Sequence, residues 1–110
     1  ILTNKIYTKN HEWIETKSKN HMIGVSNYVL KQMGEIVYIE FINNIGDSIY
    51  KNEKIVILES VNSVTEIIAP FDCIIYDQNS NLDDNLNLVD LSQNPENDNN
   101  WIIKLVEIHN

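Results

Sequence analysis

The stretch Leu58–Pro70, "LESVNSVTEIIAP", decides how this sequence is interpreted. Two runs rich in β-branched residues flank a short polar segment that contains Asn62. Such runs favour strands, and a short polar break between them favours a tight turn. The sequence therefore predicts a β-hairpin with Asn62 near its tip, and it places Glu59 just before the tip and Glu66 just after it.

Length and composition indicate a single small domain. The chain has 110 residues, of which 43% are hydrophobic, so we expect one domain spanning residues 1–110 with a packed core. The net charge is −8 and every basic residue is a lysine. Without a Lys/Arg cluster, nucleic acid and anionic membrane are poor partners, whereas basic proteins suit an acidic surface. The chain begins at Ile1 without methionine, so a processed or trimmed N-terminus is expected.

Short strands separated by turns account for most of the chain. The expected strands are Lys5–Thr8, Glu12–Thr16, His21–Val25, Glu35–Ile42, Ile55–Leu58, Glu66–Ala69, Cys73–Tyr76 and Trp101–Ile108. A two-turn helix is expected between Ser26 as N-cap and Gly34 as its C-terminal stop. Leu82, Leu86 and Val89 have helical spacing and predict a helical turn, and Ser92–Asn100 predicts a loop. This pattern predicts a β-sandwich or barrel with short helical segments.

The tryptophans and turn residues carry further expectations. Trp13 and Trp101 lie beside apolar residues in alternating patterns, and both are expected to be largely buried. Asn52 occupies a turn position compatible with a left-handed backbone conformation.

No set of residues predicts catalysis or metal binding. His11, His21 and His109 have no metal-ligand spacing with one another or with Cys73. Cys73 is the one potential nucleophile, but its β-branched neighbours favour a buried strand position instead. Three glycines do not supply a phosphate-binding loop. The sequence therefore predicts a protein without catalytic residues.

Several segments together resemble the glycine cleavage system H-protein family. They follow the family's order from Tyr7 to Leu105, nearly the whole chain. The segments are "YTKNHEWIE" (7–15), "IGVSNYVLKQMGEIVYIEF" (23–41), "IGDSIYKNEKIVILESVN" (45–62), "APFDCII" (69–75), "NSNLDDNLNLV" (79–89) and "NNWIIKL" (99–105). Each motif alone is a modestly specific signal for the family, whereas their ordered combination is a strong signal.

The resemblance implies a lipoyl-type fold, a flattened β-barrel or sandwich (a barrel-sandwich hybrid). It implies a carrier that shuttles an aminomethyl group on a lipoyl arm and is not itself an enzyme. The implied partners are glycine decarboxylase, aminomethyltransferase, dihydrolipoyl dehydrogenase and a lipoate-attaching enzyme. The implied compartment is the mitochondrial matrix in a eukaryote and the cytoplasm in a bacterium.

The resemblance also assigns site residues. Glu59 matches the glutamate that lipoate-attaching enzymes recognise. Glu12 of "HEW" and Glu66 match acidic residues beside the cleft that shelters the aminomethyl arm, so we expect both to approach one concave surface. Each of the three glutamates is also compatible with an ordinary solvated charge.

Asn62 departs from the family at the lipoyl-attachment position, where a lysine is expected. A carboxamide nitrogen is a poor nucleophile because its lone pair is delocalised, and no lysine occurs between Lys54 and Lys104. We therefore expect no lipoate on this chain. One explanation is a turn asparagine in a hairpin that lost its cofactor, and another is an altered lysine codon. The corresponding functions are an H-protein carrier with an inert site, or a non-carrying relative that serves as a binding module or assembly subunit.

Overall fold

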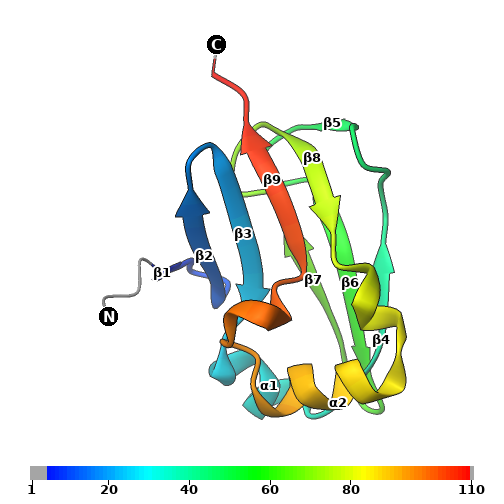
Figure 1. The fold of residues 1–110 in the computed structure, drawn as a ribbon. Helices are drawn as coiled ribbons and strands as arrows, with labels where there is room; N and C mark the ends of the chain where they lie inside the picture. The colour runs from blue at the N-terminus through cyan, green and yellow to red at the C-terminus, as the bar shows by residue number, and fades with distance from the viewer. Residues whose placement is uncertain (1–4, 110) are drawn as a thin grey trace.

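The computed structural model describes residues 5–109, which form two antiparallel β-sheets with the core between them (Figure 1). The larger sheet has the strand order β1-β2-β3-β9-β8-β5, and the smaller has the order β4-β6-β7. The strands are β1 (Lys5–Tyr7), β2 (Glu12–Lys17), β3 (Asn20–Val25), β4 (Ile36–Phe41), β5 (Ser48–Ile49), β6 (Lys54–Ser60), β7 (Val64–Ile68), β8 (Cys73–Gln78) and β9 (Ile103–Glu107). This architecture confirms the predicted sandwich.

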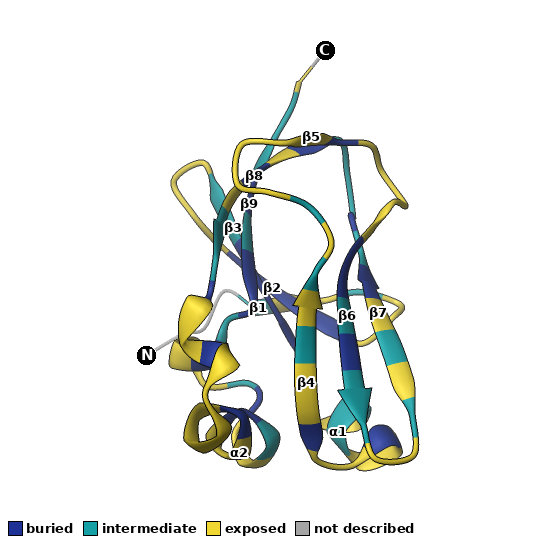
Figure 2. Ribbon diagram, turned by 90° about the vertical axis from the view of Figure 1, so that its right-hand side faces the viewer, coloured by how far each residue is buried: buried dark blue, intermediate teal, exposed yellow. Residues whose placement is uncertain are grey.

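Two short α-helices lie at the end of the sandwich where the β6–β7 hairpin turns (Figures 1 and 2). The helices are α1 (Asn27–Met33) and α2 (Asn85–Gln93), with 3₁₀ turns η1 (Ser80–Asp83) and η2 (Asp98–Asn100). Within residues 5–109, none of these helices is long and apolar enough to cross a membrane.

The predicted helix boundaries are confirmed for α1. Ser26 is its N-cap residue, and Gly34 follows its last turn with φ 80°, a conformation that glycine adopts without steric cost. Asn52 has φ 76°, as the turn pattern predicts.

Two elements differ from the sequence expectation. The sequence does not predict strand β5. Only two of its residues pair with β8, which is too few to leave an alternating pattern. Helix α2 continues through Ser92, which the sequence assigns to a loop. The Ser92 hydroxyl explains the extension, since it donates to the Leu88 carbonyl at 2.8 Å and accepts the Ile36 N–H at 3.0 Å. This contact joins α2 to the start of β4.

The core is formed by apolar residues from both sheets and from α2 (Figure 2). Its largest fully buried members are Ile23, Ile36, Ile55, Leu58, Ile67, Ile75, Leu91, Ile102, Ile103 and Leu105. Leu58 and Ile67 belong to the hairpin itself, so the inner face of β6 and β7 is anchored while their outer face remains exposed.

Trp13 is completely buried against a glycine on the neighbouring strand. Trp13 in β2 lies opposite Gly24 in β3, and a Cβ atom on Gly24 would overlap the indole ring. Gly24 is required here for space and not for backbone conformation. Trp101, by contrast, is only partly buried, with the Lys104 ammonium 4.4 Å from its ring centroid. The expectation that both tryptophans are largely buried is therefore clearly met only at Trp13.

The loop at residues 94–100 is tied to the N-terminal half of the chain. The Trp13 indole N–H donates to the Pro95 carbonyl at 2.9 Å. The Tyr7 hydroxyl donates to Glu96, which also accepts the Asn27 N–H at the start of α1 at 2.8 Å. These hydrogen bonds make the loop a bridge between β1, β2 and α1.

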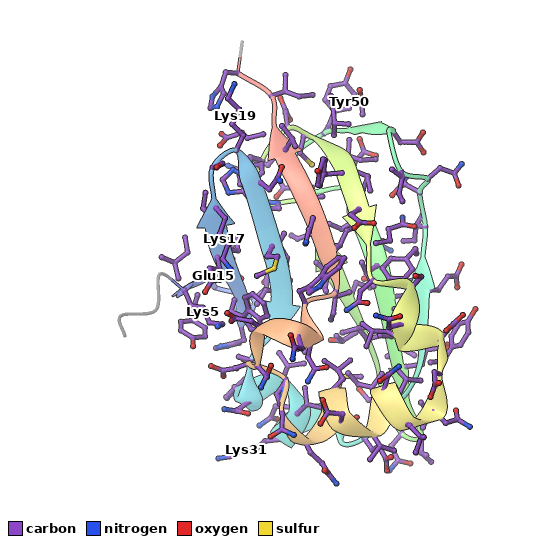
Figure 3. The ribbon with its side chains drawn as sticks, in the orientation of Figure 1. Lys5, Glu15, Lys17, Lys19, Lys31 and Tyr50 are labelled. Atoms are coloured by element: carbon purple, nitrogen blue, oxygen red, sulfur yellow. The ribbon has the colours of Figure 1, made fainter. Side chains whose placement is uncertain are left out.

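A row of charged side chains beside Trp13 also links the loop to β1 and β2. The Lys5 ammonium lies 4.8 Å from the Trp13 ring centroid and pairs with Asp98 in η2. Glu15 lies between Lys5 and Lys17, at 3.7 Å and 3.6 Å (Figure 3). Burial lowers the pKa of Lys5, but its carboxylate partners outweigh that effect and raise it overall.

Candidate functional site

The β6–β7 hairpin presents Asn62 at its exposed tip. The Ser60 N–H donates to the Ser63 carbonyl at 2.9 Å, and the Ser60 hydroxyl donates to the same oxygen at 3.3 Å. Val61 and Asn62 lie between these residues and are both exposed, with 84% of Val61 accessible to solvent. The tip therefore projects into solvent from a regular hairpin.

The backbone at Asn62 does not adopt the left-handed conformation. The non-glycine residues with positive φ in the described part of the chain are His11, Ser18 and Asn52. Because Asn62 has no positive φ, the turn conformation does not require asparagine. A lysine side chain is compatible with the same backbone.

Glu59 lies beside the tip on the outer face of the small sheet. The cross-strand register alternates acidic and apolar side chains on this face. One row is Tyr38, Glu59 and Val64, and the next is Glu40, Ile57 and Glu66. Glu66 forms an ion pair of 2.9 Å with Lys54. The outer face is therefore acidic, with exposed apolar side chains between the carboxylates.

Glu12 is buried and lines a cavity of about 360 Å³. The walls come from the turn before β2 and the start of β2, from the turn after β5, and from the end of β7 with the segment that follows it. The lining residues are Thr8, Lys9, Asn10, Glu12, Lys51, Asn52, Ile68, Ala69 and Pro70. The cavity thus brings together segments that are far apart in the sequence.

The carboxyl of Glu12 is poorly compensated in this position. Only 4% of the residue is exposed, and within residues 5–109 its one side-chain hydrogen bond is from the Thr8 hydroxyl to Oε1, at 3.1 Å. Burial raises the pKa of Glu12 to about 7, although the Thr8 hydrogen bond lowers it slightly. Desolvation disfavours the ionised form, so Glu12 exchanges a proton near neutral pH.

Glu66 is not one of the residues that line the Glu12 cavity, although Ile68, two residues further along β7, is one of them. Glu66 is paired with Lys54 on the outer face of the small sheet, and it is absent from the walls of the Glu12 cavity. The cations that line this cavity are Lys9 and Lys51. Each glutamate therefore has its own environment, one buried and one exposed.

The family model of the glycine cleavage H-protein matches residues 5–110. The chain belongs to this family. The glycine cleavage system H protein of Listeria innocua is 33% identical over 103 residues, which cover 94% of this chain and 79% of that protein. The H protein of Thermotoga maritima is 31% identical over 101 residues, which cover 92% of this chain and 78% of that protein.

A solved H-protein structure supports the fold. The crystal structure of a glycine cleavage system H protein from Mycobacterium marinum superposes with a TM-score of 0.81 at 20% sequence identity. The match covers 97% of this chain and 86% of that chain. The mainly β architecture with two antiparallel sheets is therefore the H-protein fold.

Cys73 is not placed for nucleophilic chemistry in this H-protein fold. Its side chain is fully buried, and burial raises the pKa of the thiol to about 11, with smaller contributions from Asp72 and Glu53. The reactive thiolate is therefore scarce at neutral pH. Among the described residues, no three His, Cys, Asp or Glu side chains form a metal-binding group.

Sequence reasoning identified Glu12 but missed its surroundings. Lys9 and Lys51 were not singled out, although both occur in short polar turns next to H-protein motifs. Their proximity depends on how the turn before β2 meets the turn after β5. The sequence offers one local signal, Asn52, which is a favoured turn residue and indicates a turn next to Lys51.

Proposed function

We propose that this chain occupies the place of the aminomethyl carrier in the glycine cleavage system and is not loaded with lipoate at Asn62. The observation that carries this proposal is a regular, exposed hairpin whose tip residue has no amine. Family membership supports the docking role, and the chemistry of asparagine supports the lack of loading. Residues 1–110 act as one H-protein-like domain without a catalytic centre of their own.

The residues at the tip do not fit a lipoyl group. Attachment requires a nucleophilic amine that attacks an activated carboxyl carbon, and the lone pair of a carboxamide nitrogen is delocalised. The nearest lysine along the chain, Lys54, is paired with Glu66 at the far end of β6. No carrier step can therefore be assigned to this tip.

The proposed partners are those of the H-protein: glycine decarboxylase, aminomethyltransferase, dihydrolipoyl dehydrogenase and a lipoate-attaching enzyme. Glu59 is the residue through which the attaching enzyme would recognise the hairpin. The relatives are bacterial, which favours the cytoplasmic alternative and gives no support to a mitochondrial one. Nucleic acid and membrane partners are not proposed, because the charge pattern of the sequence does not favour them.

The decisive experiment compares chains with and without a lysine at the hairpin tip. This chain, Asn62→Lys, Asn62→Gln and Val61→Lys are each incubated with a lipoate-attaching enzyme, ATP and lipoate. Only Asn62→Lys is expected to gain the mass of a lipoyl group. Asn62→Gln controls for the substitution and Val61→Lys for a misplaced amine. A lipoyl mass on the unsubstituted chain would refute the proposal.

A second function, a non-carrying binding module, is favoured by the exposed apolar side chains around the tip. Val61 and Val64 are 84% and 62% exposed, and Tyr38 is 51% exposed. If Asn62→Lys stays unmodified on an intact fold, the recognition features have also been lost and this function is preferred. Mass spectrometry of the native polypeptide makes a separate distinction, since a lipoyl mass there would show that the gene encodes lysine.

A further inference from the structure

The hairpin tip contains an asparagine followed by a serine, and the same dipeptide occurs a second time in the chain. The two copies are Asn62-Ser63 at the tip and Asn79-Ser80 at the start of η1. An asparagine side chain readily reaches nearby backbone groups, and a small following residue leaves its own backbone nitrogen accessible. The two copies therefore share the same local chemistry, and only their structural surroundings differ.

The copy at the tip is open to attack on its carboxamide. The turn between β6 and β7 lies at the surface (Figure 2), and Asn62 is exposed there. The turn is closed by hydrogen bonds from the Ser60 N–H and hydroxyl to the Ser63 carbonyl. Among the described residues, neither the Asn62 carboxamide nor the Ser63 N–H takes part in a hydrogen bond. The Ser63 nitrogen can therefore approach the carboxamide carbon when the side chain rotates.

The second copy is buried, and its carboxamide is hydrogen-bonded at both nitrogen and oxygen. Only 4% of Asn79 is exposed. Its amide nitrogen donates to the Trp101 carbonyl at 2.7 Å and to the Asn99 carbonyl at 3.4 Å. Its oxygen accepts the Asn81 N–H at 3.3 Å. This carboxamide cannot rotate toward the Ser80 nitrogen without breaking these hydrogen bonds.

We propose that Asn62 is a site of spontaneous deamidation and that Asn79 is protected from the same reaction. The Ser63 nitrogen loses its proton and bonds to the carboxamide carbon of Asn62. The bond from that carbon to the amide nitrogen breaks, and ammonia leaves. Water then opens the resulting cyclic imide (a succinimide) at either of its carbonyls. The products are aspartate and isoaspartate at position 62, and water is the only other reactant.

Either product changes the tip permanently, because the ammonia is lost. Aspartate adds a negative charge near Glu59, on a chain whose net charge is already −8. Isoaspartate carries the main chain through its side chain, which adds a carbon atom to the turn and displaces the Ser60–Ser63 hydrogen bonds. Neither product has an amine. The inference therefore needs only an asparagine at position 62 and does not rest on the proposed function.

The test follows the two copies in the whole folded chain by mass spectrometry. Fresh protein is kept in water labelled with ¹⁸O at mildly alkaline pH, which favours loss of the Ser63 proton. Samples are then cleaved after glutamate in ordinary water, which releases Ser60–Glu66 and separates the tip from Asn79. The tip peptide should exchange its amide for a labelled carboxyl group at least about tenfold faster than the Asn79 peptide, whose hydrogen bonds must open first.

Three variants and a denatured control sharpen the result. Ser63→Gly should accelerate the reaction and Ser63→Val should slow it, because the side chain at this position hinders the approach of its own nitrogen. Asn62→Gln should stay unmodified over the same time, since it must close a larger ring. In concentrated urea both copies lose their surroundings, so the rates at Asn62 and Asn79 should become similar.

Three outcomes would overturn the proposal. The first is equal rates at Asn62 and Asn79 in the folded chain, which would mean that burial and hydrogen bonding do not control the reaction. The second is a tip that stays unmodified in the folded chain, which would mean that the turn holds the Ser63 nitrogen away from the carboxamide. The third is an equally fast exchange in Asn62→Gln, which would show that ring closure onto the Ser63 nitrogen is not the route.

Discussion

The hairpin tip and the 94–100 loop are both polar surface segments in the sequence, yet they are held very differently. At the tip, Val61 and Asn62 project into solvent beyond the Ser60–Ser63 hydrogen bonds. In the loop, backbone and side-chain atoms bond to β1, β2 and α1. The tip is free to change residue type at little cost in stability, whereas the loop has become part of the scaffold.

Different parts of the chain therefore carry the proposed function and the stability of the fold. Asn62, the proposed attachment position, is exposed at the hairpin tip, where few contacts depend on it. The residues that tie the loop, such as Trp13 and Glu96, have no role at the hairpin. The following predictions test this separation, from the largest expected effect to the smallest.

Replacing Trp13 by alanine should be the most damaging change. The indole is fully buried and also donates to the Pro95 carbonyl, so the expected loss is about 3–5 kcal/mol in the free energy of unfolding. Chemical denaturation measures this loss. Trp101→Ala is the matched control and should cost clearly less, because Trp101 is only partly buried. Equal losses would contradict the packing described for Trp13.

Replacing Glu12 by glutamine should change how stability depends on pH. Burial raises the pKa of Glu12 from its ordinary value of 4.5 to about 7, so the folded state binds the proton more tightly than the unfolded chain. The stabilisation from this group is complete below about pH 4.5 and is lost as pH rises through about 7. Glu12→Gln should therefore be more stable than the parent at about pH 8, by roughly 1–3 kcal/mol.

Denaturation at several pH values measures this difference. Glu66→Gln is the control, since Glu66 is exposed and paired with Lys54, and it should leave the pH dependence between about pH 5 and 7 unchanged. A Glu12→Gln variant with the parent's pH dependence would show that Glu12 ionises normally.

Replacing Glu96 by alanine should loosen the loop moderately. The carboxylate accepts from the Tyr7 hydroxyl and the Asn27 N–H, and losing two largely exposed hydrogen bonds costs about 1 kcal/mol. Because the hydrogen bond to Glu96 is the main cause that raises the pKa of Tyr7, the variant should shift phenol ionisation to lower pH. Absorbance titration detects the phenolate, and Glu35→Ala should leave Tyr7 unaffected.

Replacing Asn62 by lysine should have the smallest effect on stability, within about 0.5 kcal/mol. The tip is exposed and its backbone needs no left-handed conformation. Thermal unfolding of the parent and of Asn62→Lys should therefore give nearly the same midpoint. A large shift in either direction would mean that Asn62 has a structural role that the hairpin does not reveal.

Most of the fold could be predicted because its signals are local. Alternating β-branched residues gave β6, β7 and β8, and Ser26 and Gly34 bounded α1 correctly. Strand β5 escaped prediction because two paired residues leave no periodic pattern. The end of α2 escaped because Ser92 is held by a distant N–H, that of Ile36, and not by a helix-forming preference.

The candidate site also has one part that the sequence could predict and one that it could not. Asn62 at the tip was predictable, since a turn between two strands can be recognised within a dozen residues. The surroundings of Glu12 and Glu66 were not, because they depend on which turn covers Glu12 and which lysine forms an ion pair with Glu66. Both facts arise from contacts between segments that are far apart along the chain.

The sequence alone determined the H-protein family, the succession of most strands along the chain and the lack of an amine at the hairpin tip. These properties belong to single residues or to short periodic patterns, and no long-range contact can alter them. Only the tertiary structure decided that Glu12 is buried beside a cavity, that Lys9 and Lys51 line it, and that the 94–100 loop bridges β1, β2 and α1. Burial, and with it the pKa of a carboxyl group, is a property of how distant segments pack around a residue.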